Sequence, residues 1–131
     1  MVDRFNSITQ RYQWRPEFEG IELRGPNDAG VDGDTLLHLV VSNGKIDDIS
    51  YLLSIGGEVN RRGDMGNTPI HYAAMAGRTD VVKLLIEAGA DASVENELGD
   101  TALSWAEACH HEDTVNYLSS LNEQSNSGGA K

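Results

Sequence analysis

The chain has 131 residues, of which 39% are hydrophobic and 24% charged, and these values fit one small globular domain. Its formal net charge of −11 argues against nucleic acid as a partner, because phosphate contacts need clustered Lys and Arg. With Cys109 as the single cysteine, no internal disulfide can form. No stretch is apolar enough for a membrane span or a signal peptide, so we expect a cytoplasmic chain.

The first expected element is an N-terminal arm, residues 1–32, that is rich in large apolar side chains. We predict a helix over residues 5–14 that caps the segment after it, because a free tail has few such residues. The alternative is a disordered arm. The apolar residues are Phe5, Ile8, Tyr12, Trp14 and Phe18.

Beyond the arm, a 33-residue period runs through the sequence, and an internal period of this length is typical of repeat proteins. Glycine and threonine recur in register, followed by an apolar residue and then by histidine or serine. Aspartate, β-branched residues and leucine recur later in each unit. The aligned sets are Gly33, Gly66 and Gly99; Thr35, Thr68 and Thr101; Leu37, Ile70 and Leu103; His38, His71 and Ser104; Asp47, Asp80 and Asp113; Ile49, Val82 and Val115; and Leu52, Leu85 and Leu118.

The pattern in each unit predicts two short helices. In the middle unit, Thr68 is a good N-cap, Pro69 suits the first helical position and Gly77 can end the helix. Helices this short are unstable alone, so neighbouring pairs must stack around a continuous core. The predicted pairs are 36–42 with 47–53, 70–76 with 80–87, and 102–108 with 113–121, and a Ser/Gly/Asn-rich tail at 123–131 is expected to be disordered.

The middle unit resembles the ankyrin repeat through GNTPIHYAA at residues 66–74 and LLIEAGAD at residues 84–91. The resemblance implies an all-α solenoid of stacked helix–turn–helix units with projecting turns. It also implies repeats at 33–65 and 66–98 and a C-terminal capping repeat at 99–122. The last unit departs from the pattern, with Ser104 in place of histidine and His110 in place of glycine.

The same resemblance implies a non-catalytic chain that binds a protein partner through its turn tips and the exposed face of each first helix. Tyr72 and Trp105 share a position that is usually aliphatic, where they serve either as binding anchors or as core residues. The expected partner-binding residues are Val31, Asp32, Asp34, Ser42, Asn43, Arg62, Asp64, Met65, Asn67, Tyr72, Met75, Ala76, Glu95, Glu97, Leu98, Asp100, Trp105, Glu107 and Ala108.

Acidic side chains dominate the expected turn tips, which favours a partner with a basic surface and an affinity that falls with salt. We expect the free chain to be monomeric. One hypothesis is an antidote or immunity protein that covers the basic site of a toxin or enzyme.

Two alternatives belong to other functional classes. A metal or catalytic site could use His38, His71 and the cluster at 109–113, and a structural subunit could brace a larger assembly. A metal needs several ligands that converge on one point, and adjacent residues rarely do so. We therefore interpret the two histidines as structural hydrogen-bonding residues and the cluster as a polar turn, and we expect no catalytic residue, metal or cofactor.

Overall fold

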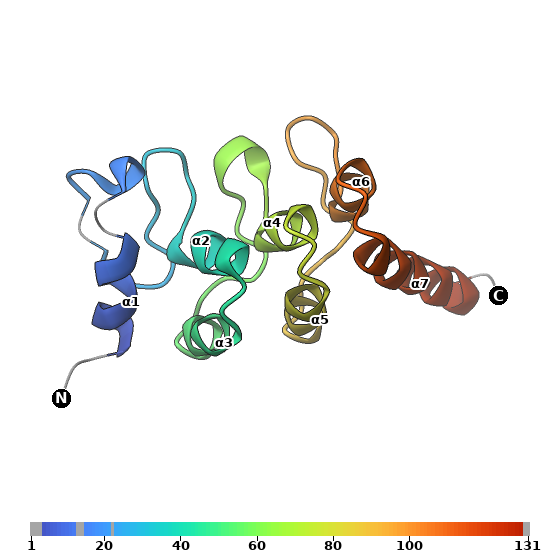
Figure 1. The fold of residues 1–131 in the computed structure, drawn as a ribbon, viewed down its shortest axis with the longest axis horizontal. Helices are drawn as coiled ribbons and strands as arrows, with labels where there is room; N and C mark the ends of the chain where they lie inside the picture. Colours follow the sequence, from blue (N-terminus) through green and yellow to red (C-terminus); the bar gives the residue numbers. More distant parts are fainter. Residues whose placement is uncertain (1–3, 13–14, 22, 130–131) are drawn as a thin grey trace.

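The computed structural model describes residues 4–12, 15–21 and 23–129, and an arm precedes three helix pairs in it (Figure 1). The arm contains α1 (Arg4–Tyr12) and the 3₁₀ helix η1 (Pro16–Phe18). A second 3₁₀ helix, η2 (Asp64–Gly66), precedes the middle pair. The pairs are α2 (Leu36–Asn43) with α3 (Ile46–Ser54), α4 (Pro69–Met75) with α5 (Thr79–Glu87), and α6 (Ala102–Ala108) with α7 (Glu112–Gly129).

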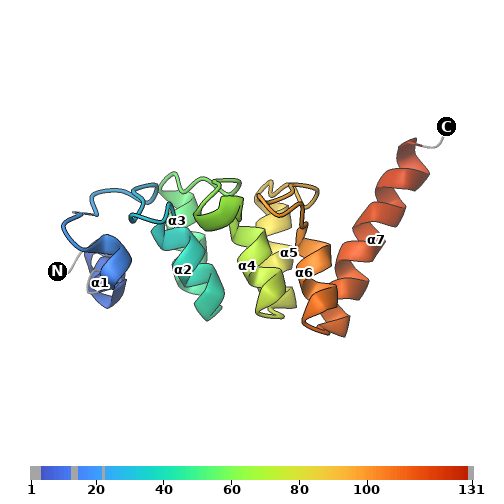
Figure 2. The same ribbon diagram turned by 90° about the horizontal axis from the view of Figure 1, so that it is seen from above.

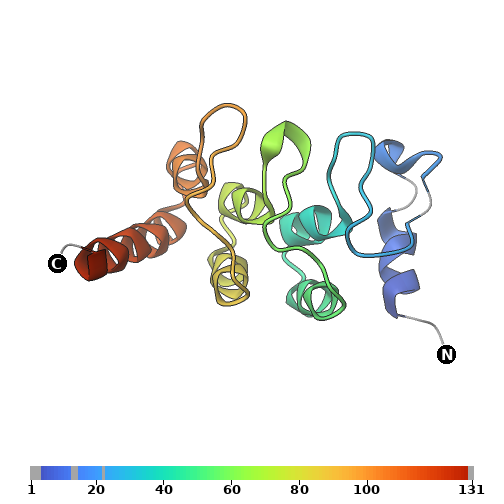
Figure 3. The same cartoon turned by 180° about the vertical axis from the view of Figure 1, so that it is seen from behind.

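The first helices α2, α4 and α6 pack side by side in chain order, and each also packs on the second helix of its own pair. Three loops project along one edge of the stack, while α3 and α5 lie towards the opposite edge (Figures 1 and 3). We call these loops the fingers, and they comprise residues 28–35, 61–68 and 94–101. This arrangement confirms the predicted all-α solenoid.

Threonine and glycine set the limits of the first helices, as the sequence predicted. Thr68 is the N-cap of α4 with Pro69 in its first turn, and Thr35 and Thr101 are the N-caps of α2 and α6. After the last turn, Gly44 and Gly77 have φ values of 71° and 69°. This left-handed conformation ends a helix at little cost only when the residue is glycine.

The third pair ends its first helix in the same left-handed conformation without a glycine. His110 stands at the place of Gly77 and has a φ of 61°. An L-residue with a full side chain is destabilised in this region by about 1–2 kcal/mol, because its Cβ approaches the carbonyl oxygen. The third unit therefore keeps the backbone path of the other two and retains a local strain.

Helix α1 covers the end of the stack beside α2 and α3. Phe5, Ile8 and Tyr12 are buried in the same core as the helix pairs. The guanidinium of Arg11 donates to Asp48 of α3 at 2.7 Å. Burial raises the pKa of Asp48, but the hydrogen bond from Arg11 and the charges of Arg11, Arg4 and Lys45 together outweigh burial and lower it. The predicted helix at 5–14 thus appears as Arg4–Tyr12, and Trp14 lies outside the described residues.

The last helix is longer than the sequence predicted. Helix α7 runs through residues 123–129, where we expected a disordered tail, and it extends away from the stack (Figure 2). No proline or glycine interrupts the sequence between Glu112 and Ser127, so nothing in the chain breaks the helix before the two glycines at its end.

Candidate functional site

The fingers share one backbone design. Each is closed by a backbone hydrogen bond that spans four residues, at positions offset by 33 along the chain. These bonds run from the nitrogen of Gly30 to the oxygen of Asp34 (2.9 Å), from Gly63 to Asn67 (2.7 Å), and from Asn96 to Asp100 (2.9 Å). The three fingers therefore present their tips in equivalent positions along the edge of the stack.

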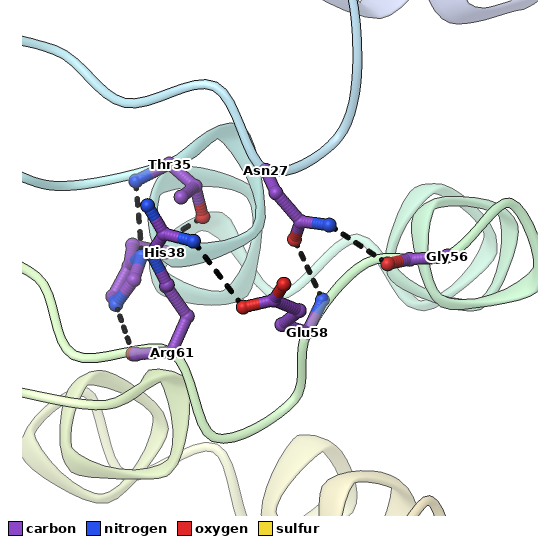
Figure 4. Close-up of polar contacts among 6 residues, drawn as sticks. All are labelled: Asn27, Thr35, His38, Gly56, Glu58 and Arg61. Carbon is purple, nitrogen blue, oxygen red and sulfur yellow. Dashed lines mark hydrogen bonds and ion pairs between the residues drawn. The ribbon is translucent and has the colours of Figure 1, made fainter.

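His38 connects the first pair to the next finger. Its Nδ1 accepts from the backbone N–H of Thr35 at 3.0 Å, and the Thr35 hydroxyl lies 2.9 Å from the same nitrogen (Figure 4). Its Nε2 lies 2.9 Å from the carbonyl oxygen of Arg61 and 3.1 Å from that of Asn67. Because both neighbours of Nε2 are carbonyls, the proton lies on Nε2. Because Nδ1 accepts from Thr35, it carries no proton and the ring is neutral.

His71 repeats this arrangement one unit later. Its Nδ1 accepts from the N–H of Thr68 at 3.0 Å, and its Nε2 donates to the carbonyl oxygen of Asp100 at 2.9 Å. Burial lowers the pKa of both His38 and His71, which keeps the rings neutral. All four ring nitrogens thus have protein partners, and the contacts support the structural interpretation of these histidines.

In the third unit, Ser104 occupies the repeat position of His38 and His71. Ser104 hydrogen-bonds within its own helix start, where its backbone nitrogen donates to the Thr101 hydroxyl at 3.2 Å. No finger follows α6 in the described residues, so a histidine at this position would have no carbonyl to bond.

Two asparagines form a second ladder between successive units, and our sequence analysis missed it. The side chain of Asn27 donates to the oxygen of Gly56 at 2.9 Å and accepts from the nitrogen of Glu58 at 2.8 Å (Figure 4). Asn60 makes the same pair of bonds to Gly89 and Asp91, at 3.1 and 2.8 Å. Their offset of 33 residues was a signal that could have identified them.

Asp34 is a correction to the predicted binding set. It is only 7% exposed, and its carboxylate accepts from the Tyr72 hydroxyl at 3.0 Å and from the backbone nitrogen of Asp64 at 2.8 Å. Burial raises the pKa of Asp34, although its hydrogen bonds oppose this. The residue ties the first finger to the second and is not available to a partner.

Tyr72 and Trp105 are both half-buried, and their polar atoms differ in environment. The Tyr72 ring meets His38 edge-on with 5.5 Å between centroids, and burial together with the Asp34 charge raises the pKa of Tyr72. At the interface between the second and third units, Asn67 occupies the repeat position of Asp34. Its side-chain oxygen accepts from the side-chain nitrogen of Asn96 at 2.9 Å. The indole nitrogen of Trp105 is buried and has no hydrogen-bond partner among the residues that the structure describes. The contacts of Tyr72 favour its core role over an anchor role.

The tips carry the predicted residues that lie most clearly at the surface. Val31 is 77% exposed, Leu98 64% and Met65 43%. The neighbouring acidic residues Asp32, Asp64, Glu95 and Glu97 are exposed as well. Met65 also has a φ of 57°, so a bulky side chain occupies the left-handed region at the second tip.

The remaining predicted residues line the first helices and the finger bases. Ser42, Asn43, Met75, Ala76, Glu107 and Ala108 are exposed at the ends of the first helices. Asn43 is not free, because its amide donates to the Tyr12 hydroxyl. Asn67 and Asp100 are half-buried at the finger bases. Arg62 is exposed, and its guanidinium donates to the carbonyl of Glu95.

The cluster at 109–113 comprises the bend between α6 and α7 and the first two residues of α7. The Nε2 of His111 bonds the carbonyl oxygen of Met75 at 3.0 Å, and its ring lies over Gly77. A side chain at Gly77 would collide with that ring, since a Cβ would lie 2.6 Å from Nδ1. In the part of the chain that the structure describes, no three His, Cys, Asp or Glu side chains are placed to hold a metal ion.

Comparison with known proteins agrees with the geometry. The family model for ankyrin repeats, in three copies, matches residues 18–96 and 37–128. No curated protein matches the chain. None of the described helices combines the length and the apolar character that a membrane crossing needs. Ankyrin repeats are generally non-catalytic protein–protein interaction modules. Because the two matches together cover far more than half of its length, the chain belongs to the ankyrin-repeat family.

Proposed function

We propose that this chain is a non-catalytic module that binds one protein partner with a basic surface through its finger tips and the exposed ends of its first helices. The observation that carries the proposal is the composition of the tips. Each of the three exposes one large apolar side chain next to one carboxylate: Val31 with Asp32, Met65 with Asp64, and Leu98 with Glu97.

The placement of apolar surface supports this proposal. Five large hydrophobic side chains are exposed among the described residues, and three of them are at the tips. A fourth, Met75, lies at the end of α4 in the predicted binding set, and only Ile55 lies elsewhere. Apolar contacts with adjacent carboxylates suit a partner whose basic residues surround an apolar patch.

The rigidity of the fingers supports high specificity for a single partner. His38 and His71 tie the second and third fingers to the preceding first helices, and Asn60 ties neighbouring units together. A preformed surface loses little conformational entropy on binding. Within this proposal, the module acts as an antidote when the basic surface it covers is the active site of a toxin or enzyme. We further propose that the free chain is monomeric, which light scattering tests directly.

Charge reversal at the tips tests the proposal. Asp64→Lys with Glu97→Lys should abolish capture of the native partner from lysate and leave the melting temperature nearly unchanged, since both side chains are exposed. Asp47→Lys with Glu87→Lys makes the same change in net charge on exposed positions of the second helices, and it should retain capture. If the two variants capture the partner equally well, the tips are not the partner-binding surface.

A further inference from the structure

The two ends of the stack differ. Helix α1 covers the end beside α2 and contributes apolar side chains to the core. Helices α6 and α7 lie at the opposite end, and no further helix pair follows them in the described residues (Figure 1). We call the outward side of this last pair the end face, and we define it by Leu103 and Glu107 of α6 and Val115 of α7.

The end face occupies register positions that join one unit to the next. In the first two units the residues at these positions are at most 1% exposed. In the third unit, Leu103 and Val115 are partly exposed and Glu107 is exposed. The units differ in whether another described pair follows, so these positions face the following pair. The equivalent residues are Leu37, Val41 and Ile49 in the first unit and Ile70, Ala74 and Val82 in the second.

Two recesses open beside these residues. The larger has a volume of about 420 Å³, and its wall contains Val115 together with Glu107 and Glu112. The smaller has a volume of about 160 Å³, and its wall contains Leu103 and Leu118. An apolar cavity of about 150 Å³ accommodates a benzene molecule, so even the smaller recess has room for one apolar side chain.

The charge at the end face is negative. Lys83 is the last Lys or Arg in the sequence before residue 131, whereas Asp and Glu recur throughout the third unit. Glu107 and Glu112 are exposed, and neither forms an ion pair with a described residue. A ligand that places basic side chains beside its apolar contacts would therefore complement this face.

A second copy of the chain does not complement it. Two end faces in contact would bring Glu107 and Glu112 of both copies together, and like charges across an interface oppose association. Contact between opposite ends is blocked as well, because α1 already covers the other end of the stack. The charge and the covered end therefore favour a different protein as the occupant.

We propose that the end face binds a helix of a partner protein that carries apolar side chains on one side and Lys or Arg beside them. The apolar side chains contact Leu103 and Val115, and the basic ones face Glu107 and Glu112. A helix suits these positions, because α4 and α5 pack on α6 and α7 in the preceding unit. The end face is separate from the finger tips, so the inference adds a second surface to the proposed function and does not depend on it.

A synthetic helical peptide tests this inference on the full chain. The probe is two fluorescently labelled copies in tandem of Leu-Ala-Lys-Lys-Leu-Ala-Lys, which place Leu at helical spacing on one side. One control has the same residues in an order that distributes Leu around the helix, and the other has Glu in place of every Lys. Fluorescence anisotropy at low salt measures the affinity, and amide chemical shifts locate the bound peptide.

The probe should bind about tenfold more tightly than either control, with shifts centred on the end face. Glu107→Lys with Glu112→Lys should weaken it about tenfold, because two attractive contacts become repulsive. Both side chains are exposed, so this variant keeps the fold. Asp47→Lys with Glu87→Lys makes the same change in net charge on the second helices and should weaken the probe by less than about threefold.

The apolar contact has its own variant. Val115→Thr should weaken the probe about fivefold, since it places a hydroxyl against an apolar side chain. Circular dichroism checks that each variant keeps the helix content of the parent chain. If Val115→Thr does not fold, the two exposed glutamates still decide the outcome.

Several outcomes would overturn the inference: no binding of the probe, equal binding of either control, shifts centred on the finger tips, or equal losses in the two charge-reversed variants. A free chain that light scattering shows to be a dimer, and that Glu107→Lys converts to a tighter dimer, would assign the end face to a second copy instead. Partner capture that depends on Asp64 and Glu97, together with a failed probe, would leave the proposed function standing and remove this inference alone.

Discussion

Replacement of His71 by alanine gives the most direct test of how the units are held together. The buried N–H of Thr68 would lose its acceptor at 3.0 Å, which costs about 1–3 kcal/mol. The carbonyl of Asp100 would lose Nε2–H but keep the bond from Asn96, so its contribution is about 1 kcal/mol or less. The volume left by the imidazole adds about 1–2 kcal/mol.

The expected loss for His71→Ala is therefore about 2–6 kcal/mol of unfolding free energy. Ser104→Ala is the matched control, because Ser104 has the same repeat position but no bond to a following finger, and it should cost less than about 1 kcal/mol. Urea unfolding followed by circular dichroism measures both. Losses that differ by less than about 0.5 kcal/mol would show that the histidine does not bridge the units.

Four further predictions concern stability. Thr68→Ala should lower the unfolding free energy by about 1 kcal/mol through loss of the N-cap, and Thr68→Ser should restore most of it in the same urea assay. Asp34→Ala should cost about 1–3 kcal/mol, because Tyr72 and Asp64 lose a buried acceptor; an unchanged urea midpoint would contradict this. His110→Gly should raise the melting temperature, since glycine removes about 1 kcal/mol of left-handed strain. Folding lowers the pKa values of His38 and His71 below their ordinary value of 6.5. As the pH falls through 6.5, the unfolded chain therefore binds more protons than the folded chain, and the urea midpoint should decrease.

The fold could be predicted because the limits of the first helices are encoded locally. Thr68, Pro69 and Gly77 determine where α4 begins and ends without reference to distant residues, and the 33-residue period then repeats the unit. The length of α7 was harder to predict, because composition alone suggested a disordered tail for residues that continue a helix. Helix ends without strong stop signals depend on context that the sequence does not display.

The exposure of individual site residues was less predictable. Asp34 and Asp32 look equivalent in the sequence, yet Asp34 is buried because Tyr72, from the next unit, reaches back to its carboxylate. The same interface explains why Tyr72 is not a free anchor. This contact joins residues 38 positions apart in the chain, so no local sequence pattern indicates it. The exposure of the tips was easier to predict, since Val31, Met65 and Leu98 lie outside the helix pairs.

Two serines in the last unit occupy the positions of the residues that bridge the earlier units. Ser104 stands where His38 and His71 reach forward, and Ser93 stands where Asn27 and Asn60 reach forward. Both connectors are thus missing from the same end of the chain. A further ankyrin unit fused after α6 and a shortened α7 would lack the histidine and asparagine bridges that join the earlier units. Restoring histidine at 104 and asparagine at 93 would reopen that end, which makes the chain a defined starting point for longer designed arrays.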